Sequence, residues 1–168
     1  MPLAPAINDW LADKGEWKGI DWLHEAMHAN IGLVDNPFTA EQLRLTLNLT
    51  RGHAVAFGSS GYGKTVFLRT LIMALASTHS PKELQVYMFD FGGRGLDLLT
   101  ELPHVGASIQ PTEVERVTRM MRKIASELEY RKQVLSDAKA ESLYHYNTQN
   151  PDKTIPSILV VVDNFAEF

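Results

Sequence analysis

The sequence contains no cysteine, which excludes disulfide bonds and thiolate metal sites. It also lacks any apolar run near the roughly 18 residues that a membrane-spanning helix requires. Its N-terminus has no basic stretch followed by an apolar one, so we identify no signal peptide. We therefore expect a chain of cytoplasmic character, or one held at the cytoplasmic side of the cell membrane as part of a larger anchored protein.

An excess of positive charge is missing too. Lysine and arginine together number 16 against 20 aspartates and glutamates, and the net charge is −4. No global basic field is therefore present to attract nucleic acid, although a basic patch can still exist locally. The length of 168 residues and the apolar content of 45% fit about one soluble domain with a real core.

What the sequence does contain is the pattern G-x-x-x-x-G-K-[ST], the phosphate-binding loop of nucleoside triphosphatases. Its residues are Gly58, Ser59, Ser60, Gly61, Tyr62, Gly63, Lys64 and Thr65. Residues 53–57 form an apolar run of strand length before it, and residues 66–76 are typical of a buried helix after it. The alternative is a glycine-rich turn that carries a lysine by chance, and the flanking strand and helix favour the phosphate loop.

The residue types of this loop suit a triphosphate and a magnesium ion. Glycines let successive backbone N–H groups point at phosphate oxygens, and the positive end of the following helix adds to that cradle. Lys64 would reach the β and γ phosphates, and the Thr65 hydroxyl would ligate Mg²⁺. ATP and Mg²⁺ are the cofactors that we expect.

Further strands are predicted around this loop. Residues 31–35 and the alternating leucines of 43–49 indicate two strands, of which the second should be half-buried. Residues 84–89 indicate a buried strand that ends at Asp90, and residues 157–163 indicate another that ends at Asp163. Apolar residues followed by aspartate, downstream of a phosphate loop, predict that Asp163 holds the metal through water and faces Thr65.

The rest of the chain gives weaker signals. Thr112 and Glu115 form a capping box before a helix, whose apolar stripe comprises Val114, Val117, Met121, Ile124 and Leu128. Its other face should be solvated with internal pairs, with DNA binding as the alternative; its charged residues are Arg116, Arg119, Arg122, Lys123, Glu127 and Glu129. Residues 144–156 are expected to form a surface loop. Arg94, in a flexible turn at 91–95, is either a solvated loop residue or a contact to nucleotide or a neighbour.

One motif is interpreted as a decoy. His24, Glu25 and His28 match H-E-x-x-H, which on a helix binds zinc in metalloproteases. The segment is short and peripheral, and the sequence after His28 does not continue as in one zincin branch. We expect an amphipathic helix with surface histidines rather than a zinc site.

Four segments occur in the order found in FtsK/SpoIIIE-type ATPases: residues 89–93 (FDFGG), 102–106 (LPHVG), 127–131 (ELEYR) and 161–165 (VVDNF). Residues 32–37 (GLVDNP) ahead of the loop look more like the tandem ATPase modules of type VII secretion motors, of the EccC or EssC kind. The resemblance covers residues ~30 to 168. Its combination of motifs is more specific than the phosphate loop alone.

The resemblance implies a P-loop NTPase with an α/β fold, a RecA-like three-layer sandwich whose sheet is mostly parallel. Residues 1–30 would form a helical or irregular lead-in, and residues 31–168 an ATPase module that stops after the strand carrying Asp163. The implied role is in a motor that exports proteins, oligomeric in its parent, beside sister modules and small helical-hairpin substrates. The alternatives are a DNA translocase module of the same family, which the net charge disfavours, and a degenerate nucleotide-binding interaction module.

The sequence departs from the family pattern at the position after Asp163. Relatives that hydrolyse ATP well carry a glutamate there, which polarises the attacking water. This chain has Asn164, whose amide cannot accept the proton of water. Glu167 would need a bend in the chain to substitute. Lys64 and Asp163 therefore stand as the catalytic residues, with Asn164 in an impaired glutamate position and ATP hydrolysis expected to be weak.

Overall fold

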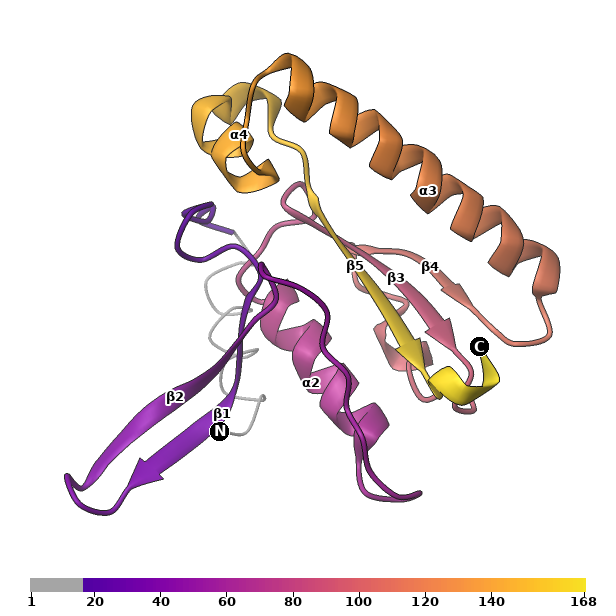
Figure 1. Ribbon diagram of the computed structural model, residues 1–168. Coiled ribbons are helices and arrows are strands. Elements are labelled where there is room, and N and C mark those ends of the chain that lie inside the picture. Colours follow the sequence, from indigo (N-terminus) through magenta and orange to yellow (C-terminus); the bar gives the residue numbers. More distant parts are fainter. Residues whose placement is uncertain (1–16) are drawn as a thin grey trace.

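The computed structural model describes residues 17–168, which form a three-stranded parallel sheet with helices on both faces and a separate hairpin (Figure 1). The strands are β1 (His28–Asn36), β2 (Glu41–Asn48), β3 (Leu84–Asp90), β4 (Val105–Ile109) and β5 (Ser157–Asp163). The helices are α2 (Lys64–Ala76), α3 (Val114–Asp137) and α4 (Leu143–Gln149), with short 3₁₀ turns at Asp97–Leu99, Pro151–Lys153 and Phe165–Glu167. No helix in this range is long and apolar enough to cross a membrane.

The central strand of the sheet is β3, and both of its edges are paired. The strand order is β4-β3-β5, with both pairings parallel. Because side chains alternate between the faces of a strand, Leu84, Val86 and Met88 share one face, and all three are fully buried in the core cluster that includes α2. The predicted strands at 84–89 and 157–163 are confirmed, as is a helix over 66–76.

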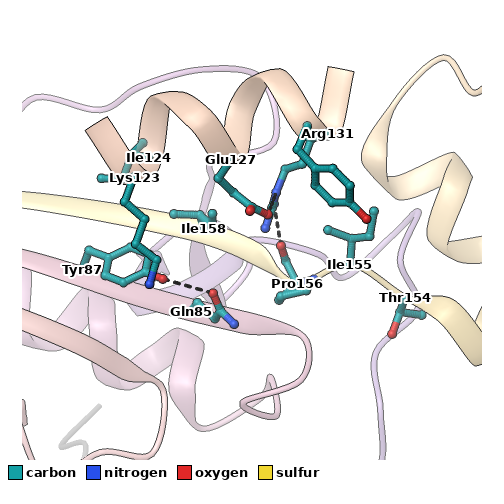
Figure 2. Close-up of a pocket in the computed structure, with 11 residues that line it drawn as sticks. Gln85, Tyr87, Lys123, Ile124, Glu127, Arg131, Thr154, Ile155, Pro156 and Ile158 are labelled. Carbon is teal, nitrogen blue, oxygen red and sulfur yellow. Dashed lines mark hydrogen bonds and ion pairs between the residues drawn. The ribbon is translucent and has the colours of Figure 1, made fainter. Parts of the chain in front are cut away.

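The opposite face of the sheet is covered by α3, and this covering is loose. A cavity of about 390 Å³ separates the helix from β3 and β5, and Figure 2 shows Lys123 reaching down beside Tyr87. The Lys123 ammonium lies 5.9 Å from the centre of that ring. Arg131 closes one end of the cavity, where Nε donates to Glu127 at 2.8 Å and Nη1 donates to the carbonyl of Pro156 at 2.7 Å (Figure 2).

The predicted apolar stripe of this helix is therefore not a buried stripe. Val114, Met121 and Leu128 are 67%, 42% and 51% exposed. Arg131 is the one α3 residue that counts as buried. The basic residues at 116, 119, 122 and 123 are exposed, as expected for a solvated face. Lys132 forms an ion pair with Glu129 within the helix, and Arg116 forms one with the N-cap residue Glu113.

The segments before and after the long helix α3 differ from what the sequence predicts. The capping box is wrong, because α3 begins at Val114 and its N-cap residue Glu113 makes no side-chain cap. The Glu113 carboxylate instead accepts from the backbone of Gln110 at 2.9 Å and from Arg116, and these two bonds lower its pKa. The surface loop predicted at 144–156 is wrong as well: Ser142 caps α4, and buried Asn147 makes two 2.8 Å bonds to the backbone of Ile155.

The chain before the phosphate loop forms an antiparallel hairpin, β1 with β2, that projects from the sheet (Figure 1). The base of the hairpin joins the core through Ala29, while Leu43 and Leu45 are 54% and 44% exposed and so are less buried than predicted. The strand predicted at 53–57 does not form. A strand needs a partner for its backbone groups, and no segment within residues 17–168 pairs with this one.

Buried histidines join the N-terminal segment to the sheet. His79 is fully buried; its Nε2 accepts from the backbone N–H of Met27 at 3.1 Å, and its Nδ1 lies 3.0 Å from the carbonyl of Leu75. His104, from the segment at 102–106, donates from Nε2 to the carbonyl of His79 at 2.7 Å. Accepting from Met27 requires a neutral His79 ring.

We expect acid to destabilise the fold through His79. Burial lowers its pKa, and His104 lowers it further, while the bond to Leu75 and the charges of Glu83 and Glu25 oppose the shift. A histidine whose folded pKa lies below its unfolded value of about 6.5 contributes full stability above that value and loses it as pH falls, by about 1.4 kcal/mol per unit of pKa difference. Urea unfolding at pH 7.5 and 5.5 measures this loss.

The control for this prediction is His145→Gln, which removes an exposed histidine and should keep the wild-type pH dependence. His79→Gln should flatten the dependence between pH 7.5 and 5.5. An equally steep dependence in His79→Gln would assign the acid sensitivity to other groups.

Candidate nucleotide site

The phosphate-loop residues form an exposed turn that leads directly into α2. Gly61 and Gly63 have positive φ angles of 81° and 82°, a backbone conformation that glycine adopts without strain. The Lys64 ammonium donates to the carbonyls of Gly58 at 2.8 Å and Ser59 at 2.9 Å, so its charge lies across the loop. The first turn of α2 carries no acidic side chain, so the positive end of the helix remains available to an anion.

The metal-side residues predicted from the sequence lie together. The Thr65 hydroxyl donates to Asp163 Oδ2 at 2.6 Å, although the two residues are 98 positions apart. Thr65 lies in the first turn of α2 and Asp163 ends β5, so both lie at the carboxyl edge of the sheet, where open α/β sheets bind ligands. A hydroxyl and a carboxylate are oxygen ligands of the type Mg²⁺ prefers. The residues present therefore fit a magnesium ion with a nucleotide phosphate.

A glycine-rich segment, residues 91–96, lies against this pair; we call it the strap. A Cβ added to Gly92 would lie 2.5 Å from Asp163 Oδ2, and one added to Gly95 would overlap the methyl group of Thr65. Arg69 fixes the strap from α2, since its Nε donates to the carbonyl of Gly95 at 2.5 Å. Glycine is required at 92 and 95 because only a bare backbone can approach the two metal-side residues this closely.

The FtsK/SpoIIIE family model matches residues 11–168. The chain belongs to the FtsK/SpoIIIE family. Its fold is accordingly that of the P-loop NTPases in this family, with the parallel three-stranded sheet described above.

Relatives of this FtsK/SpoIIIE chain belong to type VII secretion systems. It is 35% identical over 172 residues to the ESX secretion system protein EccC of Thermomonospora curvata, a match covering 98% of the chain. It is 33% identical over 147 residues to the type VII secretion system protein EssC of Staphylococcus aureus, covering 86% of the chain. The chain spans only 13% of that EccC and 10% of that EssC.

Solved structures agree with this family assignment. The structure of T. curvata EccC ATPases 2 and 3 in complex with a signal sequence peptide superposes with a TM-score of 0.76 at 34% identity. EssC ATPases 2 and 3 from Geobacillus thermodenitrificans give a TM-score of 0.75 at 32% identity. Each match covers 84% of this chain and 27% of the other.

Asn164, the residue after Asp163, is held in the left-handed region, with φ 59° and ψ 60°. Asparagine tolerates this conformation better than most residues. Its amide nitrogen lies 3.4 Å from the carbonyl of Phe91, at the start of the strap. Glu167 ends the 3₁₀ turn that follows, and Phe168 packs edge-on against Phe89 with ring centres 5.2 Å apart. The side chain of Asn164 thus contacts the strap.

Other candidate residues of this FtsK/SpoIIIE chain lie apart from the pair. Arg94 is 77% exposed, has a positive φ of 65° and approaches Asp97 at 4.0 Å, so it is a solvated residue at the outer side of the strap. The helix expected around His24 and His28 is replaced by turns, and His28 begins β1. His24 Nδ1 lies 2.8 Å from Asp21, which lowers the pKa of that carboxyl. Groups of three or more histidine, aspartate or glutamate side chains that could share a metal ion do not occur within residues 17–168.

The strand end at Asp90 and the turn at 91–95 were expected from the sequence, but no role in the site was predicted for Asp90 or for the strap glycines. Asp90 ends β3, is fully buried, and accepts from the backbone N–H of Leu96 at 2.7 Å. The sequence does contain a pattern that predicts such a segment: Asp90 ends a buried strand, and three of the next five residues are glycine. A segment of this composition can fold back on its own strand.

We expect Gly92→Ala to destabilise the fold. The added methyl would overlap Asp163, whose side chain cannot swing away without losing the bond from Thr65. Overpacking of this kind costs about 1–3 kcal/mol, measurable by urea unfolding. Gly32→Ala is the control, since a Cβ there meets nothing within 4 Å; its stability should stay equal or rise by up to about 1 kcal/mol. Equal stability of wild type and Gly92→Ala would refute the close approach of the strap.

Proposed function

We propose that this chain is an ATP- and Mg²⁺-binding module of a type VII secretion motor, similar to the second or third ATPase of EccC or EssC. The observation that carries the proposal is the Thr65–Asp163 hydrogen bond beside a complete phosphate loop. The loop glycines and Lys64 would hold the phosphates, Thr65 would ligate the metal, and Asp163 would hold it through water. The bound magnesium would neutralise charge on the β and γ phosphates.

Partners and location follow from the relatives as further parts of this proposal. Two of the matching structures are described as cytoplasmic domains of EssC and EccC, so we propose a place on the cytoplasmic side of the membrane. The EccC and EssC structures contain ATPases 2 and 3, which supports sister modules as neighbours. We propose in addition that the parent protein is oligomeric. The EccC complex with a signal sequence peptide supports secreted proteins as cargo, and we propose that these are small helical-hairpin proteins.

Replacement of Lys64 tests nucleotide binding. We expect Lys64→Ala to lose at least tenfold in affinity for Mg·ADP, because a charge-assisted contact to phosphate is worth about 1.5–3 kcal/mol. Titration calorimetry measures this on the complete gene product. Lys82→Ala removes an exposed lysine outside the loop and should bind like wild type. Equal affinity in wild type and Lys64→Ala would refute the site.

Replacement of Asn164 tests hydrolysis. A carboxylate general base typically contributes about 10²–10⁴-fold, so Asn164→Glu in the complete gene product should raise steady-state phosphate release while nucleotide affinity stays constant. Asn164→Gln is the matched control, because glutamine has the size of glutamate and would adopt the same left-handed backbone at this position, but has no carboxylate. Brisk hydrolysis by the wild type that Glu167→Gln abolishes would show instead that Glu167 is the base.

A further inference from the structure

Asp90 has a carboxylate oxygen that the fold leaves unused. The residue is 0% exposed, and Oδ2 accepts from the N–H of Leu96 at 2.7 Å. Oδ1 is buried and has no hydrogen-bond partner among residues 17–168. Nor does Asp90 form an ion pair within that range. A buried carboxylate oxygen without a donor is costly, so it indicates a group still to be bound.

The position of Asp90 relative to Asp163 follows from the sheet. The two residues are register partners at the carboxyl ends of β3 and β5. Neighbouring strands lie about 4.8 Å apart. Asp90 shares a face of β3 with the core residues Val86 and Met88, and Asp163 shares a face of β5 with Leu159 and Val161, so both carboxylates lie on the α2 side.

Thr65 lies in the first turn of α2 on this same side and donates to Asp163. The carboxyl edge therefore brings together one hydroxyl and two carboxylates. A magnesium ion keeps several of its waters when bound to protein, and those waters need acceptors beyond the first ligands.

We propose that Asp90 is a second carboxylate of the metal site, whose Oδ1 accepts a hydrogen bond from a water of the Mg²⁺ held by Thr65 and Asp163. This rests on the proposed function, namely that the site binds Mg·nucleotide. Asp90 acts as a positioning residue, because it touches the metal's water and not the metal.

The same carboxylate also fixes the strap. Its Oδ2 holds Leu96, the adjacent Gly95 lies against Thr65, and Gly92 lies against Asp163. One side chain would thereby orient the water of the metal and hold the segment that closes over both metal-side residues. Two different substitutions of Asp90 can therefore distinguish these two roles.

The experiment compares Asp90→Asn with Asp90→Ala in the complete gene product. Asn keeps an oxygen that can accept from Leu96 but removes the charge, whereas Ala removes both. The readout is the Mg²⁺ concentration that gives half-maximal binding of a fluorescent ADP analogue, with binding in EDTA measured in parallel. We expect Asp90→Asn to raise that concentration about 10–100-fold, the usual effect of losing an outer carboxylate, with binding in EDTA and the thermal midpoint unchanged. Asp90→Ala should also lower the thermal midpoint.

Asp97→Asn is the control, since Asp97 lies on the turn that follows the strap and its side chain is 44% exposed. It should keep the wild-type Mg²⁺ requirement. A wild-type requirement in Asp90→Asn would overturn the inference and confine Asp90 to holding the strap. Absence of Mg·nucleotide binding in the wild type would overturn the proposed function itself, which is a different result.

A measurement on the wild type covers the case in which Asp90→Asn fails to fold. Infrared difference spectra with ¹³C-aspartate, recorded on adding Mg²⁺ to the nucleotide-bound protein, report the carboxylates that the metal perturbs. We expect two perturbed aspartates. A single one would overturn the inference.

Discussion

The parallel pairing of β3 with β5 is the constraint on which the rest of the molecule depends. Together with the pairing of β4 on the other edge, it makes β3 a central strand whose apolar side chains are buried against α2 on one face. Parallel strands in register end together, so the pairing also brings Asp90 and Asp163 to one edge. Thr65 reaches that edge because α2 begins there. The geometry of the site is thus a consequence of sheet register and needs no long, flexible connection.

The site also shows why glycines lie next to Thr65 and Asp163 in this structure. The strap contacts Thr65 and Asp163 through backbone alone, and Arg69 and Asp90 fix it from two elements. Asp163 is therefore packed against Gly92, and Thr65 against Gly95, and neither glycine adds a side chain to the site. Such bracing holds a constellation rigidly without filling the space that a phosphate requires.

The features predicted correctly from the sequence are those set by local pattern: the apolar strands that end at Asp90 and Asp163, and the helix that follows Gly63. The failures have non-local causes. Residues 53–57 have the composition of a strand, but pairing depends on a partner that the pattern of one segment cannot reveal. The capping box failed because Glu113 binds Gln110, and the strap was missed because contact with Thr65 depends on the register of the sheet.

The side chain of Lys64 is hydrogen-bonded to the backbone of the phosphate loop itself. Two carbonyls accept from its ammonium, so the proposed binding of phosphate by Lys64 would exchange these two hydrogen bonds for contacts to the nucleotide. The enthalpy of binding would then be that of the phosphate contacts minus that of the two lysine hydrogen bonds, and would be smaller than the phosphate contacts alone give. The carbonyls of Gly58 and Ser59 would become free to bond to water once Lys64 turned to the phosphate, so hydration of the loop backbone would also contribute to the enthalpy of binding.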